Sequence, residues 1–542
     1  MKKTFLLFAV ISLLLFSNLN LIAQTPDWLW ARVAGGNSYN EAMSIAADDS
    51  GNTYVAGYYN IFAWDLPHAN GTDAFFVKYD PSGNIIWTRS LSSTGTDRVF
   101  SIATDKLGHF YIFGYFSGPS IVICDDTLTN TVVNKFDMFV AKYDTNGNCI
   151  WVRQVSGAGQ DTPTGMAVDS LGNCFITGYH ESPTLNFGTQ ILTNSGGVDI
   201  FLAKYDPNGT ALWAKSASGS ANEYSRSVAV DKFGNSYITG DFNTASISFG
   251  GTVLVKTGNQ DMFLTKYSSS GNVLWVNHPD GTQDMHGNSV AVDSVANIYI
   301  GGSFNYDITF DTTTLTSSGN LDILLVKYAM DGSFLWAKSV GGTAEDAATT
   351  VATDYLGYCY LAGYYNSASI TMGVYPLTNN GSGFKDIFVS EYNAAGDVVW
   401  AKSIGGLTGD YPNAIQPVLS RDVYIAGCLG STSITIGDST FANAGTTNIL
   451  VAKSGNTPAT SLHEFSNSAS ISVFPNPAND FITFSCPQKA TIEIQNIAGQ
   501  VVRTTSTNGN AATLDLRNLS SGVYIIKATT DKEMVTKKFI KK

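Results

Sequence analysis

Hydrophobic residues in this chain fall in short runs, separated by clusters of Gly, Asn, Asp and Ser. One stretch shows the pattern clearly, with SVAVD at 227–231, SYITGDF at 236–242, DMFLTKY at 261–267 and NVLWV at 272–276. Runs of this kind, rich in Val, Ile, Tyr and Phe and bounded by turn residues, are typical of β-strands joined by tight hairpins. They do not alternate cleanly between apolar and polar positions, which indicates strands buried on both faces of a sheet.

This four-run pattern repeats along the chain. Tryptophans mark it at intervals of 57 to 64 residues, and most of them begin a similar sequence motif, such as WAKSASG or WAKSVGG. Four short strands repeated at this period are typical of β-propeller blades. The pattern therefore predicts an all-β fold, a seven-bladed β-propeller over residues 24–453. The marking tryptophans are Trp30, Trp87, Trp151, Trp213, Trp275, Trp336 and Trp400.

The two ends of the repeat region complement each other. The seventh repeat lacks a tryptophan run, whereas an unmatched run, DWLWARVA, stands at 27–34 before the first complete repeat. We expect 27–34 to supply the outer strand of the seventh blade and so close the ring without a free sheet edge. The first strand of each blade should line the central channel, and the tryptophan strand should lie outermost.

The repeated phrases resemble the SBBP-type propeller repeats of bacterial exported proteins. The resemblance rests on the Gly-Asn hairpin, the Asp-initiated FLxKY run and the tryptophan run, and it covers roughly 27–453. It implies the propeller fold. It implies little about activity, because blade residues define the family.

The N-terminus has the features of a secretory signal peptide at 1–23. Lys2 and Lys3 precede an apolar stretch from Thr4 to Phe16, and Ala23 supplies a small residue before the predicted cleavage point. The apolar stretch is shorter than the roughly 20 residues that a membrane span needs. We therefore expect an exported chain with no transmembrane segment.

The C-terminus carries a second module. Residues 454–470 are small, polar and unpatterned, as in a linker, and 471–542 again alternate short strands with turns, which predicts a small β-sandwich. The phrases FPNPAND, IAGQVV and LSSGVYIIK and the Lys-rich end resemble the type A C-terminal sorting domain of the type IX secretion system. The resemblance implies the secretion machinery as a partner, removal of the module, and a final location in the medium or on the outer-membrane surface.

The composition limits the classes of partner that the chain could bind. Hydrophobic residues make up 44% of the chain, which is enough for a large core, and the net charge of −13 disfavours nucleic acid. The C-terminal module is rich in Lys, so the propeller is more acidic than the whole chain. The six cysteines form no CxxC pair, and we expect most of them to be buried thiols.

One position varies where its neighbours repeat. It follows the second-strand glycine and holds Tyr in four of the seven repeats. Tyrosines near a loop-rich face offer stacking surfaces for sugar rings or peptide, and packing between blades is the alternative. The predicted binding residues are Tyr58, Tyr115, Tyr179, Asp241 and Tyr364, and the remaining repeats hold Ser303 and Cys428 at this position.

Aspartates recur at two further positions, the end of the first run and the start of the third. A carboxylate repeated in every blade is typical of turns in which it accepts backbone hydrogen bonds, and we expect that role. DPSGN at 80–84 and DTNGN at 144–148 lack the spacing and closing Glu of a calcium loop. The sequence predicts no metal site and no cofactor, with a structural calcium ion left open. The two sets are Asp48, Asp105, Asp169, Asp231, Asp293 and Asp354, then Asp73, Asp137, Asp199, Asp261, Asp322 and Asp386.

We expect binding rather than catalysis. No GxSxG, HExxH, P-loop or Rossmann motif occurs, and we predict a non-enzymatic propeller that captures glycan or protein, or acts as a scaffold, at or beyond the cell surface. One alternative is a polysaccharide-degrading enzyme, which needs two carboxyl groups about 5–10 Å apart. Another is a purely structural component of a surface layer. Acid/base candidates for the enzyme are the carboxylates expected on the loop-rich face: Asp97, Asp161, Glu223, Asp284, Asp346 and Asp410.

Overall fold

The computed structural model describes residues 25–455 and 472–542, with internal gaps at 37, 61–65, 67–70, 106, 382, 444, 475, 486–488, 497–499, 509–511 and 530–533. The predicted signal peptide and most of the predicted linker lie outside the described residues, although Ser454 and Gly455 belong to a strand. The chain divides into two units, Met1–Thr457 and Pro458–Lys542. No helix in the described part is long and apolar enough to cross a membrane.

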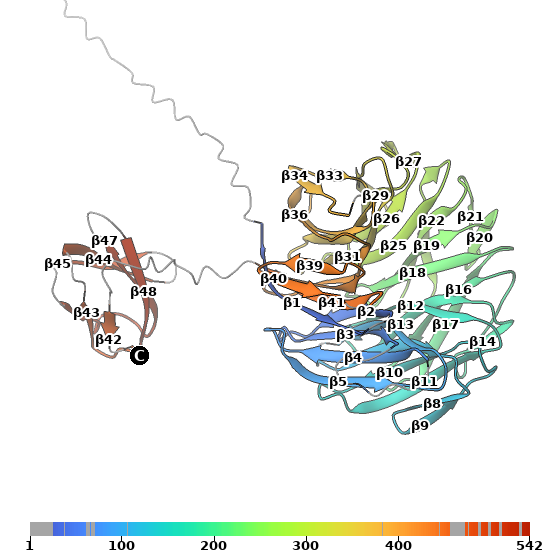
Figure 1. Cartoon of the computed structure of the whole chain (residues 1–542), viewed down its shortest axis with the longest axis horizontal. Helices are drawn as coiled ribbons and strands as arrows, with labels where there is room; N and C mark the ends of the chain where they lie inside the picture. Colours follow the sequence, from blue (N-terminus) through green and yellow to red (C-terminus); the bar gives the residue numbers. More distant parts are fainter. Residues whose placement is uncertain are drawn as a thin grey trace, which may run out of the picture. The chain divides into compact units, whose positions relative to one another are not determined.

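The first unit consists of antiparallel sheets, and in most of the four-stranded ones the strands follow chain order from the innermost to the outermost (Figure 1). Seven four-stranded groups of this kind occur among the described strands, two of them extended by a hairpin. In six groups the tryptophan strand is outermost, and in the seventh β1 takes that place. The all-β propeller fold is therefore confirmed.

Strands at equivalent places are given together. The innermost strands are β2 (Asn40–Ala47), β6 (Asp97–Thr104), β12 (Asp161–Val168), β18 (Glu223–Val230), β25 (Met285–Val292), β31 (Asp346–Thr353) and β37 (Asp410–Pro417). The second strands are β3 (Thr53–Tyr59), β7 (Phe110–Phe116), β13 (Cys174–His180), β19 (Ser236–Phe242), β26 (Ile298–Phe304), β32 (Cys359–Tyr365) and β38 (Val423–Leu429). The third strands are β4 (Asp73–Tyr79), β10 (Asp137–Tyr143), β16 (Asp199–Tyr205), β22 (Asp261–Tyr267), β29 (Asp322–Tyr328), β35 (Asp386–Tyr392) and β41 (Asn448–Gly455). The outer strands are β5 (Ile85–Leu91), β11 (Cys149–Gly157), β17 (Ala211–Ser218), β23 (Val273–Asn277), β30 (Phe334–Val340), β36 (Val398–Ile404) and β1 (Asp27–Ala34).

Burial explains why the apolar runs do not alternate. Every residue of β19 and β22 is buried, whereas β23 at the outside is partly exposed throughout. Neighbouring sheets pack on both faces of the middle strands, as when the Phe113 and Phe201 rings of adjacent sheets meet edge to face at 6.4 Å. Both faces of these strands therefore require apolar side chains.

The ring closes through strands from the two ends of the repeat region. β1 pairs antiparallel with β41, from Asp27 opposite Gly455 to Ala34 opposite Ile449. Trp30 Nε1 also donates to Pro81 O at 3.1 Å, which ties β1 to the neighbouring sheet. Residues 27–34 thus take the outer place in a sheet whose other strands come from the end of the repeat region.

Two-stranded hairpins follow the second strand in most groups, an addition that the four-run pattern does not predict. Two of them join the outer strand of the preceding sheet, because β14 pairs with β11 and β20 pairs with β17. The hairpin strands are β8 (Ser120–Ile123) with β9 (Asp126–Thr129), β14 (Thr184–Asn186) with β15 (Ile191–Thr193), β20 (Ser246–Phe249) with β21 (Thr252–Val255), β27 (Asp307–Phe310) with β28 (Thr313–Thr316), β33 (Ser369–Met372) with β34 (Tyr375–Thr378), and β39 (Ser433–Ile436) with β40 (Ser439–Ala442). The short strand β24 (Asp280–Gly281) pairs with β27.

A disulfide joins Cys124, in the β8–β9 turn, to Cys149 at the start of β11. The expectation of buried thiols is wrong for this pair. It is correct for Cys174, Cys359 and Cys428, which are buried and unpaired. A disulfide is consistent with an exported chain, because oxidising compartments preserve such bonds.

The second unit is a small β-sandwich, as predicted. One sheet contains β42 (Ser472–Phe474), β43 (Phe481–Ser485) and β46 (Ala512–Asp515). The other contains β45 (Val501–Asn508), β44 (Lys489–Asn496), β47 (Gly522–Thr529) and β48 (Met534–Lys541). Side chains from both sheets, including Phe484, Ile492 and Phe539, share one core.

Candidate binding site at the mouth of the axial channel

The innermost strands of all seven four-stranded groups surround an axial cavity of about 600 Å³. Each of these strands has a β-bulge at its fourth residue, where its register against the second strand shifts by one. A bulge re-aims the extra side chain, and all seven bulge residues line the cavity. We call them the bulge ring: Met43, Phe100, Thr164, Arg226, Asn288, Thr349 and Asn413.

Side chains of the bulge ring also connect neighbouring innermost strands. Three of them donate a hydrogen bond to a backbone carbonyl of the next strand around the ring, including the pair that spans the closure. These bonds run from Asn288 Nδ2 to Ala348 O at 2.9 Å, from Thr349 Oγ1 to Pro412 O at 2.6 Å, and from Asn413 Nδ2 to Ala42 O at 2.9 Å.

Beyond the bulge ring the lining includes several small side chains. Serine hydroxyls there bridge adjacent strands, as where Ser289 Oγ accepts a hydrogen bond from Val351 N at 3.1 Å. The serines are Ser44, Ser101, Ser227 and Ser289, and a layer of alanines follows: Ala46, Ala103, Ala167, Ala229, Ala291 and Ala352. The bulge ring lies toward the loop-rich end, where the innermost strands begin, and it includes Arg226, the only charged residue among the described residues that line the cavity.

The predicted binding residues lie around this mouth, each opposite the second residue of an innermost strand. The pairs are Glu41 with Tyr58, Arg98 with Tyr115, Thr162 with Tyr179, Tyr224 with Asp241, and Ala347 with Tyr364. Tyr58, Tyr115 and Asp241 are buried, with 6%, 5% and 0% exposure, and Tyr179 and Tyr364 are half-buried. The structure thus brings the five together but packs three of them against neighbours. Their role in binding stays a prediction.

Asp241 is the centre of a charged cluster. Arg226 binds its carboxylate in a bidentate manner, with Nε 2.9 Å from Oδ1 and Nη2 3.3 Å from Oδ2. Gln260 Nε2 also donates to Asp241, and His286 Nδ1 lies 3.8 Å from Oδ1. Burial opposes ionisation, yet His286 and Arg226 hold the pKa of Asp241 below its ordinary value. The Arg226 side chain remains 43% exposed, so the cluster has one face open to solvent.

A second cluster surrounds Tyr364. Its hydroxyl donates to Glu345 Oε1 at 2.5 Å, and Lys385 Nζ lies 3.7 Å from the centre of its ring. Lys385 also pairs with Glu345 at 3.3 Å and lies 5.2 Å from the Tyr411 ring. The cluster combines aromatic faces with one charge of each sign, an arrangement common in polar recognition sites.

A third cluster involves Tyr58 and Tyr115. The Arg98 guanidinium lies 4.0 Å from the centre of the Tyr58 ring, and Tyr115 stacks on Phe136 with ring centres 4.1 Å apart. Burial raises the pKa of Glu41, although Tyr58 and Arg98 oppose the shift. Sequence reasoning names only the second-strand position and misses the bulge ring and these charged partners. The variable residue just before each first run, such as Arg226 before SVAVD, is the signal that could have indicated the bulge ring.

Five of the six acid/base candidates are buried at the first residue of an innermost strand. Asp97, Asp161, Glu223, Asp346 and Asp410 are all 0% exposed. Burial raises the pKa of Asp97 and of Glu223 to about 7, and that of Asp161 to about 6. Each accepts hydrogen bonds from loop backbone: Asp97 from Ser93, Asp161 from Ser182, Glu223 from Gly219, Asp346 from Gly342 and Ser367, and Asp410 from Gly406 and Ser431.

Asp284 does not belong to this set. Met285 takes the equivalent place, since it pairs with Phe304 as Asp97 pairs with Phe116. Asp284 precedes β25 and accepts a hydrogen bond from Asn259 Nδ2 at 2.6 Å. Asp284 therefore lies one residue before the strand position that the other five candidates share.

The repeated aspartates serve turns, as predicted. Asp231 Oδ1 accepts hydrogen bonds from Phe233 N and Asn235 N, both at 2.9 Å, and Asp386 Oδ2 accepts one from Asn380 N at 2.8 Å. The described residues contain no group of three or more His, Cys, Asp or Glu side chains placed to hold a metal ion.

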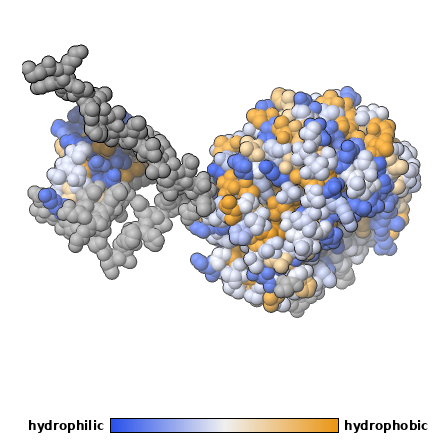
Figure 2. Space-filling view, turned by 90° about the horizontal axis from the view of Figure 1, so that it is seen from above, coloured by the Kyte–Doolittle hydropathy of each residue, from blue (hydrophilic) through white to orange (hydrophobic). Residues whose placement is uncertain are grey.

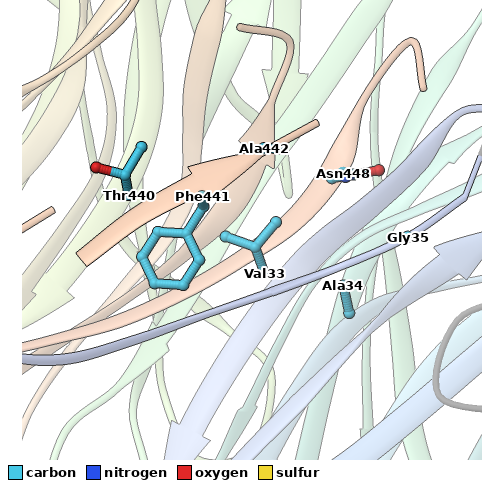
Figure 3. Close-up of a pocket in the computed structure, with 7 residues that line it drawn as sticks. All are labelled: Val33, Ala34, Gly35, Thr440, Phe441, Ala442 and Asn448. Atoms are coloured by element: carbon cyan, nitrogen blue, oxygen red, sulfur yellow. The ribbon is translucent and has the colours of Figure 1, made fainter. Parts of the chain in front are cut away.

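A second cavity, of about 520 Å³, lies between the end of β1 and the β39–β40 hairpin. Figure 3 shows the Phe441 ring and the Val33 side chain facing each other across it, with Asn448 beyond them. Few polar side chains reach it. Figure 2 shows apolar side chains interspersed with polar ones on the face in view.

Comparison with known families agrees with this architecture. Residues 472–542 match the model of a secretion system C-terminal sorting domain, and residues 150–179 match the SBBP β-propeller repeat. The protein is a propeller-repeat protein with a type IX sorting domain. The sorting domain indicates secretion and a location at the cell surface, and it implies an interaction with the secretion machinery.

Curated relatives of this propeller-repeat protein are distant and longer. An uncharacterized WD repeat-containing protein, L264, of Acanthamoeba polyphaga mimivirus is 25% identical over 550 residues, which cover 85% of this chain and 38% of the relative. The regulatory protein FlaEY of Caulobacter vibrioides is 24% identical over 371 residues, covering 63% of this chain and 37% of the relative. The chain thus spans less than two fifths of either relative.

Similarity to solved structures is weak. Sqt1 from Chaetomium thermophilum aligns with 79% of this chain and 98% of its own at 10% identity and a TM-score of 0.35. The Synechocystis apocarotenoid oxygenase aligns with 78% of this chain and 93% of its own at 8% identity and the same TM-score. Neither alignment indicates a function for this chain.

Proposed function

We propose that this secreted propeller is a non-enzymatic binding protein that captures a glycan or protein ligand at the loop-rich mouth of its axial channel. The burial of the acid/base candidates is the observation that supports binding over catalysis. Asp97, Asp161, Glu223, Asp346 and Asp410 are 0% exposed. Because each accepts hydrogen bonds from loop backbone, its role in the fold accounts for its presence.

The mouth of the channel has what a recognition site requires. It adjoins a cavity of about 600 Å³, within the usual range of about 300–1,000 Å³ for ligand sites. Arg226 is partly exposed there and fixed by Asp241, and Lys385 is fixed by Glu345. Charged groups held in place before a ligand arrives lose little conformational entropy on binding. After delivery by the sorting domain, we propose that the module is removed and that the propeller acts outside the cell.

Binding to an array would test this function. The purified chain is applied to extracellular polysaccharides and proteins, with and without calcium, and the same wells are assayed for released sugar. We expect saturable binding without product. Product release would overturn the proposal in favour of an enzyme, and the absence of both binding and product would favour a structural component of a surface layer.

A further inference from the structure

We propose that the axial cavity binds the end of a neutral, hydroxyl-rich carbohydrate chain, with the bulge ring as its recognition surface. The inference rests on the proposed binding function and names the ligand class of that site. Some hydrogen-bonding groups of the bulge ring already have partners within the fold. The remaining groups are available to a ligand in the cavity.

The bulge ring offers both acceptors and donors. Asn288 and Asn413 each use one N–H of the amide Nδ2 group as a donor to the neighbouring strand. Each therefore keeps its Oδ1 as an acceptor and has a second N–H. Thr349 donates its hydroxyl to Pro412 O, and Thr164 donates to Thr177 O at 3.2 Å, so these two oxygens also remain acceptors. A ligand that satisfies this ring must therefore carry several hydrogen-bond donors.

Arg226 adds a charged donor to the ring. Arg226 is the only charged residue among the described residues that line the cavity. Its Nε and Nη2 bind Asp241, so Nη1 lies outside that fork and is the group left for a ligand. A sugar hydroxyl both donates and accepts, and a single ring carries several of them, so it matches a site that offers both acceptors and donors.

Charge argues against the other ligand classes. Asp241 neutralises Arg226, so the ring has no net charge to attract an ion. A carboxylate has no donor for the oxygens of Asn288 and Asn413, and a cation would meet the guanidinium. A neutral polar ligand can donate to these oxygens and places no positive charge beside the guanidinium.

The opposite side of the ring is apolar. Met43 and Phe100 line the cavity there, and the Phe100 ring lies 5.5 Å from that of Tyr115. A sugar ring has an apolar face of C–H groups that packs against such side chains. The ring thus has a hydrogen-bonding side and an apolar side, while the alanine layer behind it leaves space for the end of a chain.

Calorimetry on the full chain would test the inference. The probes are neutral gluco-, manno- and xylo-oligosaccharides of two to six units, with oligogalacturonates as acidic counterparts. Thr164→Tyr would plug the cavity from a position that faces it, and Arg226→Gln would remove the cationic donor while keeping an amide for Asp241. Thr193→Tyr, on an exposed hairpin, and Arg89→Gln, on the exposed outer strand β5, repeat the same changes away from the channel.

We expect one neutral oligosaccharide series to bind with one site per chain. Thr164→Tyr and Arg226→Gln should weaken it by about tenfold or more, and the two controls should leave it unchanged. Binding that survives Thr164→Tyr, or that is restricted to the acidic series, would overturn the channel site and leave the proposed capture function standing. The absence of binding to every neutral series would also overturn it, and the array would then decide the function independently. Equal melting temperatures of variant and wild type would show that lost binding is not lost folding.

Discussion

The carboxyl groups of Asp199 and Glu223 face each other across the junction between neighbouring sheets, and both residues are 0% exposed. Asp199 starts β16 and Glu223 starts β18, the innermost strand of the next sheet. Asp199 Oδ1 and Glu223 Oε1 receive no hydrogen bond from any other described donor. Two carboxyl groups can bond only if one is protonated, and burial, with Asp199 adding to the effect, raises the pKa of Glu223 to about 7.

The arrangement recurs around the ring. At other junctions too, a carboxyl at the start of a third strand lies near a carboxyl at the start of the next innermost strand. In each pair, one carboxyl raises the pKa of the other. These pairs are Asp73 with Asp97, Asp137 with Asp161, Asp322 with Asp346, and Asp386 with Asp410. At the closing junction the two positions hold the amides of Asn448 and Asn40, which both lie next to Gly35. That junction carries no ionisable pair.

The propeller should therefore be more stable in mild acid than in mild base. The folded pKa is about 7 for Asp97 and Glu223 and about 6 for Asp161 and Asp386, all above the usual value near 4 in an unfolded chain. The folded state then holds more protons than the unfolded state between about pH 4 and pH 7, so stability falls as pH rises through 6–7. We expect Tm to drop by about 5 °C from pH 5 to pH 8 in calorimetry at constant ionic strength.

Glu223→Gln should remove part of this dependence. An amide opposite Asp199 supplies a donor without a proton from solvent, so Tm at pH 8 should rise by about 1–2 °C and change little at pH 5. Glu181→Gln, at an exposed position, is the matched control. A variant that melts below wild type at pH 8 would contradict the shared proton.

Removing the closing strand should open the ring. Deletion of 25–35 removes β1, which leaves the edge of β41 unpaired and removes Ala31, only 6% exposed, from the core between sheets. We expect Tm to fall by about 10 °C or more. A synthetic peptide of residues 25–36 should restore much of the loss, and the same peptide with Ala31→Asp should not. An unchanged melting curve after deletion would show that closure adds no stability.

The cysteines should divide into two classes. Peptide mapping of native protein is expected to find Cys124 linked to Cys149, because the structure joins them. Cys174 and Cys359 should resist alkylation until the protein unfolds, since burial shields them and raises the pKa of both thiols. Rapid labelling of either thiol in the native state would contradict the packing described.

Much of the fold was accessible from the sequence because the repeat multiplies a weak signal. A single run such as DMFLTKY is ambiguous between strand and buried helix, but its recurrence beside Gly-Asn turns predicts β22 and its equivalents. The hairpins were not predicted, since their strands have three or four residues and vary between repeats. Pairing of Cys124 with Cys149 depends on where the β8–β9 turn packs, which no spacing reveals.

The site was accessible only in part. The variable second-strand position does lie at the channel mouth, but its burial depends on partners from other strands, such as Arg98 over Tyr58. The bulge ring was not predicted, because a bulge adds one residue to a strand without a turn residue to mark it. In the sequence, Arg226 therefore looks like any other strand residue.

Deletion of 471–542 should separate delivery from folding. The sorting domain and the propeller are distinct compact units, so the truncated chain should fold with the Tm of the full chain yet remain in the periplasm of a host with type IX secretion. Cell fractionation and protease protection would measure this. Normal surface delivery of the truncated chain would contradict the role of the sorting domain.

The bulge also explains the glycine that recurs in every second strand. A Cβ on Gly302 would lie 1.9 Å from His286 O, the backbone carbonyl just before the bulge of β25. A backbone atom cannot yield as a flexible side chain can, so only glycine fits. The equivalent residues meet the same carbonyl at 1.9 to 2.2 Å: Gly57, Gly114, Gly178, Gly240, Gly363 and Gly427.

Gly302→Ala should therefore destabilise the propeller, whereas Gly301→Ala should not. At Gly301 the nearest atoms to a new Cβ are side-chain atoms, Leu361 Cδ1 at 2.9 Å and Val351 Cβ at 3.3 Å, and Ala362 occupies the equivalent place in the next sheet. We expect Gly302→Ala to lower the free energy of unfolding by about 2–3 kcal/mol and Gly301→Ala by less than about 1 kcal/mol, measured by urea denaturation. Equal effects of the two neighbours would show that general crowding, rather than the carbonyl of the bulged strand, selects the glycine.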